Sequence, residues 1–368
     1  MMFGDLLVSS SNAAGSIPLP TSGGIQPMSA TESEIVPAGI AQKMGLINDN
    51  LVVGWSGTQY VARAIMRRLH DQFGTHAPSP EELERFFNEI PVDERREVEF
   101  IAMLLVNPTT GFQIGFQAFE LSHARFGRIR ACGSGYGDLR ELVERIGAFT
   151  EHDGRDLTPY AKAVGCGLTM AGDLLAREML LGDTVGHHFG GGYEIVTLSD
   201  GRWVKADDIL TIFWVLRETR TGGLELSPIT HLIKQVYAGD LLVIRSLAFY
   251  TNRPAEDRTF YVDPPYRVSY EHERNAVQRP AFQAKWICHQ FIVQRLDGTI
   301  SPRSRITFSP TGSIPPLQVE WNGRRLNLTT SAGYFSILSE FTQSGSQALE
   351  NSLRESSTSR DAGSQVSP

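Results

Sequence analysis

The chain has 368 residues, with 34 Lys and Arg against 41 Asp and Glu, which gives a formal net charge of −7 at pH 7. A general nucleic-acid binder would be basic, so this balance argues against that class. The three cysteines are far apart and odd in number, which argues against a disulfide framework and favours a reducing, cytoplasmic compartment. No basic segment followed by an apolar run opens the chain and no apolar run reaches ~18 residues, so we expect neither a signal peptide nor a membrane span.

The first part of the chain passes from loop composition to regular patterns. We expect a strand over residues 5–11 and a loop over residues 12–33, whose Gly, Pro and Ser content cannot bury enough apolar surface to order itself. An apolar strand follows at residues 51–54, and a turn of mostly small residues at 55–57 leads into a helix pattern from Thr58. Glycine in the turn lets the helix fold back on its strand.

A second unit of the same kind lies near the middle of the chain. Residues 129–132 end a strand, Gly133-Ser134-Gly135 forms the turn, and residues 139–146 carry a helical apolar stripe. Before this unit, Ser79 is the expected cap of a helix. Residues 100–106 and 112–119 predict two antiparallel strands joined by a Pro/Gly turn.

A third pattern combines a helix, a glycine-rich loop and a hairpin. Thr158-Pro159 has the cap and proline of a helix start. Residues 182–192 form the glycine-rich loop, and residues 193–198 predict a strand that ends in the hairpin turn Ser199-Asp200-Gly201.

From residue 222 onward the chain is β-rich. Asp297-Gly298 and Asn322-Gly323 lie between apolar runs and are strong hairpin signals, because such turns need positive φ. The last residues are rich in Ser, Gln and Gly with few apolar side chains, which predicts a disordered tail. We therefore divide the chain into regions 1–221, 222–341 and 342–368.

Together these units resemble the proteasome β-subunit family of N-terminal-nucleophile hydrolases. In that family a strand of the type D-N-hydrophobic-V-G-F-A-G runs into the first helix of an αββα sandwich, and residues 49–57, Asp-Asn-Leu-Val-Val-Gly-Trp-Ser-Gly, fit the pattern. The turn at 133–135 and the glycine-rich loop before a strand ending in Asp-Gly resemble two further family motifs. The resemblance covers about residues 4–205 and implies an α+β fold, namely a four-layer αββα sandwich, here with a β-rich C-terminal extension.

The resemblance also implies particular site residues. In the family, a Thr, Ser or Cys at the mature N-terminus attacks an amide carbonyl, its own α-amine accepts the proton, a lysine lowers the pKa of that amine, and a carboxylate orients the lysine. Lys43 falls at the position of the lysine and Ser134 at that of the turn serine. The carboxylate position falls near Ser10, and the acidic and serine positions of the third motif fall near His187 and Gly190, all of which depart from the family pattern.

The strand headed by the nucleophile would begin several residues before Met1. Three explanations stay open: a non-catalytic relative, a start codon further upstream, or internal cleavage that exposes Thr21, Ser22, Thr31 or Ser33. Loss of the carboxylate favours the first, with Lys43 and Ser134 as vestigial candidates. We expect a proteasome-like protein that acts as a homo-oligomer or through a protein partner, with an active threonine-type peptidase or amidohydrolase as the alternative.

Two other motifs suggest different chemistry. Asp263-Pro264-Pro265-Tyr266 resembles the motif with which adenine-directed methyltransferases hold a flipped base. Such an enzyme also needs a glycine-rich cofactor loop between a strand and a helix, but the loop that ends at residue 192 is followed by a strand. A Pro-Pro turn that ends a strand is therefore the favoured interpretation. Asp183, His187 and His188 could suggest a metal site, although adjacent histidines in a strand point to opposite faces. We therefore expect no cofactor and no metal.

Overall fold

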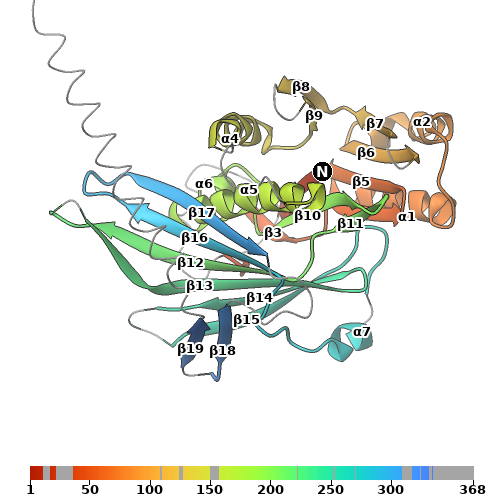
Figure 1. The fold of residues 1–368 in the computed structure, drawn as a ribbon. Helices are drawn as coiled ribbons and strands as arrows, with labels where there is room; N and C mark the ends of the chain where they lie inside the picture. Colours follow the sequence, from red (N-terminus) through yellow and green to blue (C-terminus); the bar gives the residue numbers. More distant parts are fainter. Residues whose placement is uncertain are drawn as a thin grey trace, which may run out of the picture.

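The computed structural model describes residues 1–10, 17–21, 36–107, 110–123, 127–149, 157–221, 223–250, 252, 254–269, 271–308, 317–323, 325–330 and 334. The protein is a strand-rich mixed α+β protein with several sheets (Figure 1). Among the described helices, none combines the length and apolar composition that a membrane crossing requires. The predicted tail at 342–368 lies outside the described residues.

One four-stranded antiparallel sheet carries the first sequence unit. Its order is β4-β5-β6-β7, formed by Met44–Asn48, Leu51–Gly57, Val98–Asn107 and Thr110–Phe116. The predicted strands at 51–54, 100–106 and 112–119 are thereby confirmed, except that β7 ends at Phe116 because Gln117 has a φ of 58°. Three helices follow β5 and precede β6: α1 (Gln59–Phe73), α2 (Pro80–Asn88) and α3 (Val92–Arg95). Ser79 caps α2 with a full capping box, as its sequence predicts.

The two faces of this sheet are buried against different elements. Side chains of a strand alternate between faces, and in β5 Leu51, Val53 and Trp55 pack with the apolar stripe of α1. Val52 points to the opposite face, where it packs with Met2 and Val196 of a second sheet. Every central residue of β5 is therefore buried.

The second sheet has the order β1-β10-β11, formed by Met2–Asp5, Tyr193–Ser199 and Arg202–Lys205, and all its pairs are antiparallel. The hairpin predicted at Asp200-Gly201 joins β10 to β11, with positive φ at both residues. The strand predicted over 5–11 is divided in the structure. β1 ends at Asp5, and β2 (Leu7–Ser10) pairs instead with β3 (Val36–Ile40), because the Leu6 N–H bonds to the carbonyls of Gly190 and Gly192.

Helix α5 (Pro159–Leu181), capped by Thr158 as predicted, lies between this second sheet and a large third one (Figure 1). Its residues Val164 and Leu168 pack against Ile195 of β10, and Met170 and Leu174 join a core cluster shared with the third sheet. Helix α6 (Asp183–Gly186) follows directly within the glycine-rich loop.

The third sheet has the order β15-β14-β13-β12-β16-β17, and only the β12–β16 pair is parallel among its neighbouring pairs. Its strands are Glu256–Val262, Leu241–Ala248, Leu224–Ala238, Ile209–Glu218, Trp286–Gln294 and Ile300–Phe308. The hairpin predicted at Asp297-Gly298 joins β16 to β17. The boundary that we drew at residue 221 falls between β12 and β13, so the regions on either side of it share one sheet.

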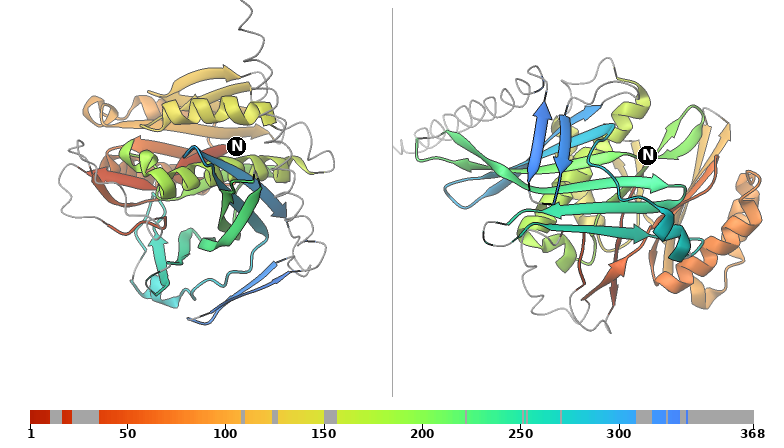
Figure 2. Two further views of the ribbon diagram at one scale, coloured as in Figure 1. Left: turned by 90° about the vertical axis from the view of Figure 1, so that its left-hand side faces the viewer. Right: turned by 90° about the horizontal axis from the view of Figure 1, so that it is seen from below.

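The remaining elements are small. The hairpin of β18 (Leu317–Trp321) and β19 (Leu326–Thr330) turns at Asn322-Gly323, as predicted, and covers the face of the third sheet away from α5 (Figure 2). Two strands, β8 (Phe119–His123) and β9 (Gly127–Ala131), pair beside β7 and lead into α4 (Tyr136–Phe149). A short helix, α7 (Glu271–Ala276), follows β15.

Glycines on α5 allow its close approach to β10. A Cβ on Gly167 would lie 2.9 Å from two side-chain atoms of Ile195, whereas a Cβ on Gly165, in the same helix, meets nothing within 4 Å. We expect Gly167→Ala to lower the free energy of unfolding by about 1–3 kcal/mol through overpacking. Gly165→Ala should instead raise it by about 0.5–1 kcal/mol through helix propensity. Urea unfolding of both variants checks this, and equal effects would contradict the proposed packing.

Candidate functional site

The backbone of Lys43 is fixed by a buried carboxylate. The Lys43 and Met44 N–H groups donate to Glu194 Oε2 at 3.0 and 3.3 Å. Glu194 is itself compensated by Lys205, whose Nζ lies 2.8 Å from Oε1, and by the hydroxyl of Tyr237 at 3.0 Å. These contacts hold the backbone at the start of β4, and the Lys43 side chain pairs with a different carboxylate.

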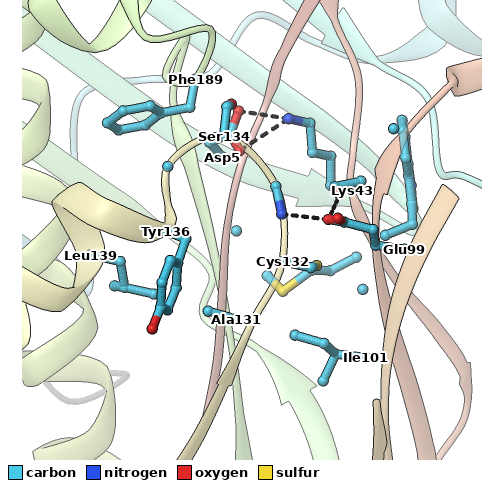
Figure 3. Close-up of a pocket in the computed structure, with 18 of the residues that line it drawn as sticks. Asp5, Lys43, Glu99, Ile101, Ala131, Cys132, Ser134, Tyr136, Leu139 and Phe189 are labelled. Atoms are coloured by element: carbon cyan, nitrogen blue, oxygen red, sulfur yellow. Dashed lines mark hydrogen bonds and ion pairs between the residues drawn. The ribbon is translucent and has the colours of Figure 1, made fainter. Parts of the chain in front are cut away.

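The Lys43 amine pairs with Asp5 at the end of β1. Its Nζ lies 2.8 Å from Oδ1 and 3.0 Å from Oδ2, and both side chains are mostly buried, with exposed fractions of 14% and 19% (Figure 3). The Asp5 carboxylate also accepts hydrogen bonds from the N–H groups of Leu7 at 3.0 Å and Gly190 at 3.3 Å. The resemblance placed the carboxylate position of the family pattern near Ser10, whereas the carboxylate that pairs with Lys43 in the structure is that of Asp5.

The turn at 133–135 is held by a second carboxylate. Glu99 of β6 accepts hydrogen bonds at 2.6 Å from both the Gly133 N–H and the Ser56 hydroxyl. Gly133 has a φ of 88°, and a Cβ there would lie 3.2 Å from that of Ser56, so glycine is required for the turn to approach β5. The Ser134 hydroxyl donates to the carbonyl of His188 at 3.0 Å.

The glycine-rich loop presents successive N–H groups to two different carboxyl groups. Gly190 donates to Asp5, and Gly191 donates to Glu178 Oε2 at 2.9 Å. Glu178 is buried on α5 and also bonds to the hydroxyls of Thr21 and Thr184. Burial raises the pKa of Glu178 to about 7, with a smaller contribution from the Asp5 charge.

Lys43 and Ser134 line one cavity of about 1340 Å³, together with Asp5, Glu99 and Cys132 (Figure 3). The structure thus brings together the two site residues taken from the family resemblance, although they are 91 positions apart (134 − 43). The rest of the wall mixes charged and polar side chains, among them Arg96, Arg128 and Arg130, with an apolar part that includes residues of β6, β9, α4 and α5. This lining includes Ile101, Ile129, Leu139, Val143, Met170 and Leu174.

The thiol beside the turn is not reactive. Burial raises the pKa of Cys132 to about 12, and the charge of Glu99 adds to the effect. Because the thiolate is the nucleophilic form, this cysteine stays protonated and inert at neutral pH. No disulfide joins the three cysteines.

The other hydroxyl and metal candidates are placed differently. Thr21 is buried against Glu178, and Ser22, Thr31 and Ser33 lie outside the described residues. His187 is exposed and bonds through Nδ1 to Asp138 at 3.2 Å. The side chain of Asp183 is not among those described, and within the described part of the chain no group of three His, Cys, Asp or Glu side chains could hold a metal ion.

The Asp263–Tyr266 motif forms packing and ion-pair contacts. Asp263 accepts a hydrogen bond from Arg274 at 2.6 Å and another from the Ser269 N–H at 3.2 Å. The Tyr266 ring is buried and stacks on His70 of α1, with ring centroids 4.4 Å apart. These contacts agree with a turn that attaches the end of β15 to α1.

Asp5 is the residue of this candidate site that the sequence analysis missed. The signal for it was available, since Met2-Phe3-Gly4-Asp5 is a short apolar strand that ends in a carboxylate. No protein-family model matches this sequence, and no curated protein matches it either.

Loss of the Asp5 carboxylate should destabilise the fold. We expect Asp5→Ala to lower the free energy of unfolding by about 2–4 kcal/mol, because Lys43 and two backbone N–H groups lose their shared acceptor. Asp5→Asn keeps one acceptor oxygen and should cost about half as much. Urea unfolding measures both. As a control, Glu94→Ala removes the more exposed Arg68–Glu94 pair and should cost less than about 1 kcal/mol. An Asp5→Ala effect no larger than this control would refute the assignment.

The raised pKa of Glu178 predicts a pH-dependent stability. Its ordinary pKa is 4.5 and its folded value about 7, so folding incurs no cost from this group below pH 4.5. Between pH 4.5 and pH 7 the free energy of unfolding falls, because Glu178 ionises in the unfolded chain before it does so in the folded one. The loss reaches about 3 kcal/mol above pH 7. Glu178→Gln stays neutral and should gain that amount over the wild type on going from pH 4.5 to pH 8. Glu84→Gln, on the exposed face of α2, should show the same difference from the wild type at both pH values.

Proposed function

We propose that residues 1–205 form the αββα sandwich of an N-terminal-nucleophile hydrolase. The packing clusters support this reading. Helices α1 and α2 cover one face of the β4–β7 sheet, the β1-β10-β11 sheet packs on the other face, and α5 covers β10 from the far side. The strand–turn–helix units lead into α1 and α4, in the chain order that the resemblance requires.

We further propose an amidohydrolase or peptidase activity at the cavity, and one observation carries it: the mostly buried ion pair between Lys43 and Asp5. In such a mechanism the hydroxyl or thiol of residue one of the mature chain attacks the amide carbonyl, and the proton passes through its α-amine to the leaving amine. The Lys43 cation holds the pKa of that amine down, so that the amine is free to accept a proton. Water then hydrolyses the ester or thioester.

Asp5 in this mechanism is a positioning residue. It fixes the Lys43 ammonium, and its bonds to Leu7 and Gly190 fix Asp5 in turn. The nucleophile belongs to the mature N-terminus, because an internal residue has no free α-amine to take the proton. The apolar cavity wall would accept apolar side chains of the substrate.

The second candidate is a non-catalytic scaffold that binds a protein partner or assembles with copies of itself. The observation that favours it is the state of the side chains at the turn. Ser56 and Ser134 each donate a hydrogen bond to a fixed acceptor, and Cys132 is protonated. In this case the cavity would serve for binding alone, and the Lys43–Asp5 pair would be structural.

One experiment distinguishes the two candidates. The protein purified from its native source is mapped at its N-terminus by mass spectrometry and then assayed on a panel of coumarin-labelled peptide amides. The hydrolase proposal expects an N-terminal Thr, Ser or Cys, measurable release of coumarin, and a loss of at least about 100-fold in Lys43→Ala. Lys162→Ala, an exposed lysine at the start of α5, is the matched control and should keep full activity.

Two results would reject the hydrolase proposal in favour of the scaffold. One is a mature chain headed by Thr, Ser or Cys that releases no coumarin, and the other is release that Lys43→Ala leaves unchanged. The mass of the native protein in solution, measured by light scattering, would then test the homo-oligomer.

A further inference from the structure

Two arginines on the outer side of α1 have no acidic partner. Arg63 is half-buried and Arg67 is exposed, and because they are four positions apart their side chains are neighbours on the helix surface. Within the described part of the chain, neither forms an ion pair with a carboxylate. By contrast, the adjacent Arg68 bonds to Glu94 at 2.6 Å. Like charges at this spacing destabilise a helix unless an anion lies close to them.

The segment after β15 brings a third arginine to this pair, since it lies beside α1 (Figure 2). The Arg63 Nη2 donates to the carbonyl of Arg267 at 2.7 Å, which holds the segment against the helix. Partial burial lowers the pKa of the Arg63 guanidinium, and the charge of Asp263 opposes this effect. The charges of Arg67 and of Arg274 on α7 lower that pKa further. Three guanidinium groups from two separate parts of the chain therefore lie near one another.

The carboxylates of this segment already have partners. Asp263 accepts hydrogen bonds from Arg274 at 2.6 Å and from the Ser269 N–H at 3.2 Å, and Glu273 pairs with Arg267 at 3.0 Å. The Arg274 Nε and the Ser269 hydroxyl are nevertheless buried without a hydrogen-bond partner among the described residues. Ser269 is only 5% exposed. Buried donors without partners are costly, so this cluster lacks an acceptor as well as a negative charge.

We propose that Arg63, Arg67 and Arg274 form a binding site for the phosphate group of a phosphate monoester. The two guanidinium groups without an ion pair carry two positive charges, and a phosphate monoester carries about −1.5 to −2 at pH 7 on three acceptor oxygens. Guanidinium groups match phosphate geometry through their paired N–H donors. The Nε and Nη1 of Arg63 have no partner among the described residues and can donate to such a ligand. This site does not rest on the hydrolase proposal.

A water molecule and a carboxylate are the competing occupants. An ordered water could accept from the Ser269 hydroxyl and the Arg274 Nε, but it carries no charge and would leave Arg63 and Arg67 uncompensated. A carboxylate brings one negative charge against two uncompensated guanidinium groups. Charge balance therefore favours a phosphate dianion over both.

Calorimetric titration of the full chain with methyl phosphate tests the proposal. In chloride buffer near pH 7.5, where the ester is largely dianionic, we expect a Kd of about 1 mM or tighter, and binding of acetate at least about tenfold weaker. Arg67→Gln should weaken methyl phosphate binding by at least about tenfold, because it removes a charge and its N–H donors. Its stability in urea should not fall, since Arg67 has no ion pair to lose. Arg68→Gln, the neighbouring arginine that faces Glu94, is the matched control and should bind methyl phosphate as the wild type does.

Three results would each overturn the proposal: no binding heat at about 10 mM methyl phosphate, binding that Arg67→Gln leaves unchanged, or acetate that binds as tightly as the ester. Vesicles of phosphatidylcholine with and without phosphatidic acid separate two sources of the same phosphate group. Once methyl phosphate binds, cosedimentation with phosphatidic acid that Arg67→Gln abolishes would identify a lipid headgroup. Cosedimentation that is absent or unaffected would identify a soluble ester. The coumarin assay reports catalysis alone, so its outcome is separate from all of these.

Discussion

The Asp5 carboxylate is the group on which the arrangement of the site depends. It accepts hydrogen bonds from Lys43, Leu7 and Gly190, which come from three separate parts of the chain. A carboxylate that is largely removed from water needs both an opposite charge and hydrogen bonds, and here each requirement determines a different piece of geometry. The ion pair orients the lysine, the Leu7 contact holds the chain just after the end of β1, and the Gly190 contact closes the glycine-rich loop over the end of that strand.

That loop separates two carboxyl groups with different charge states. Asp5 has a cation beside it, whereas Glu178 has only hydroxyl and amide partners and, with a pKa raised to about 7, is largely neutral in mildly acidic solution. Adjacent N–H groups can serve both because Gly190 and Gly191 have φ values of 124° and 71°. A side chain at Gly190 would place its Cβ 2.2 Å from Glu178 Oε2, so no other residue fits there. The two glycines thus act through their backbone geometry, which gives each carboxyl group one N–H donor. The difference between the two groups comes from Lys43, which pairs with Asp5 alone.

The sequence predicts the local parts of this structure better than the long-range ones. The Ser79 cap and the Asp297-Gly298 turn were correct because each depends on neighbouring residues alone. The pairing of Asp5 with Lys43 was missed because it joins segments 38 residues apart, across a stretch without a regular pattern. Strands β12 and β13 were not recognised either, since β12 and residues 229–235 of β13 are buried on both faces and show no alternation that would mark them.

The burial of α5 restricts how copies of this chain could assemble. One side of α5 packs on β10, and another packs on the third sheet, so this helix has little surface left for a partner. Large apolar side chains are exposed instead near the cavity: Tyr60 has 72% of its surface exposed, and Phe119, 53% exposed, stacks on Tyr136. Both Tyr60 and Tyr136 line the cavity. The exposed apolar surface beside the cavity is thus more open to a partner than the helix layer is.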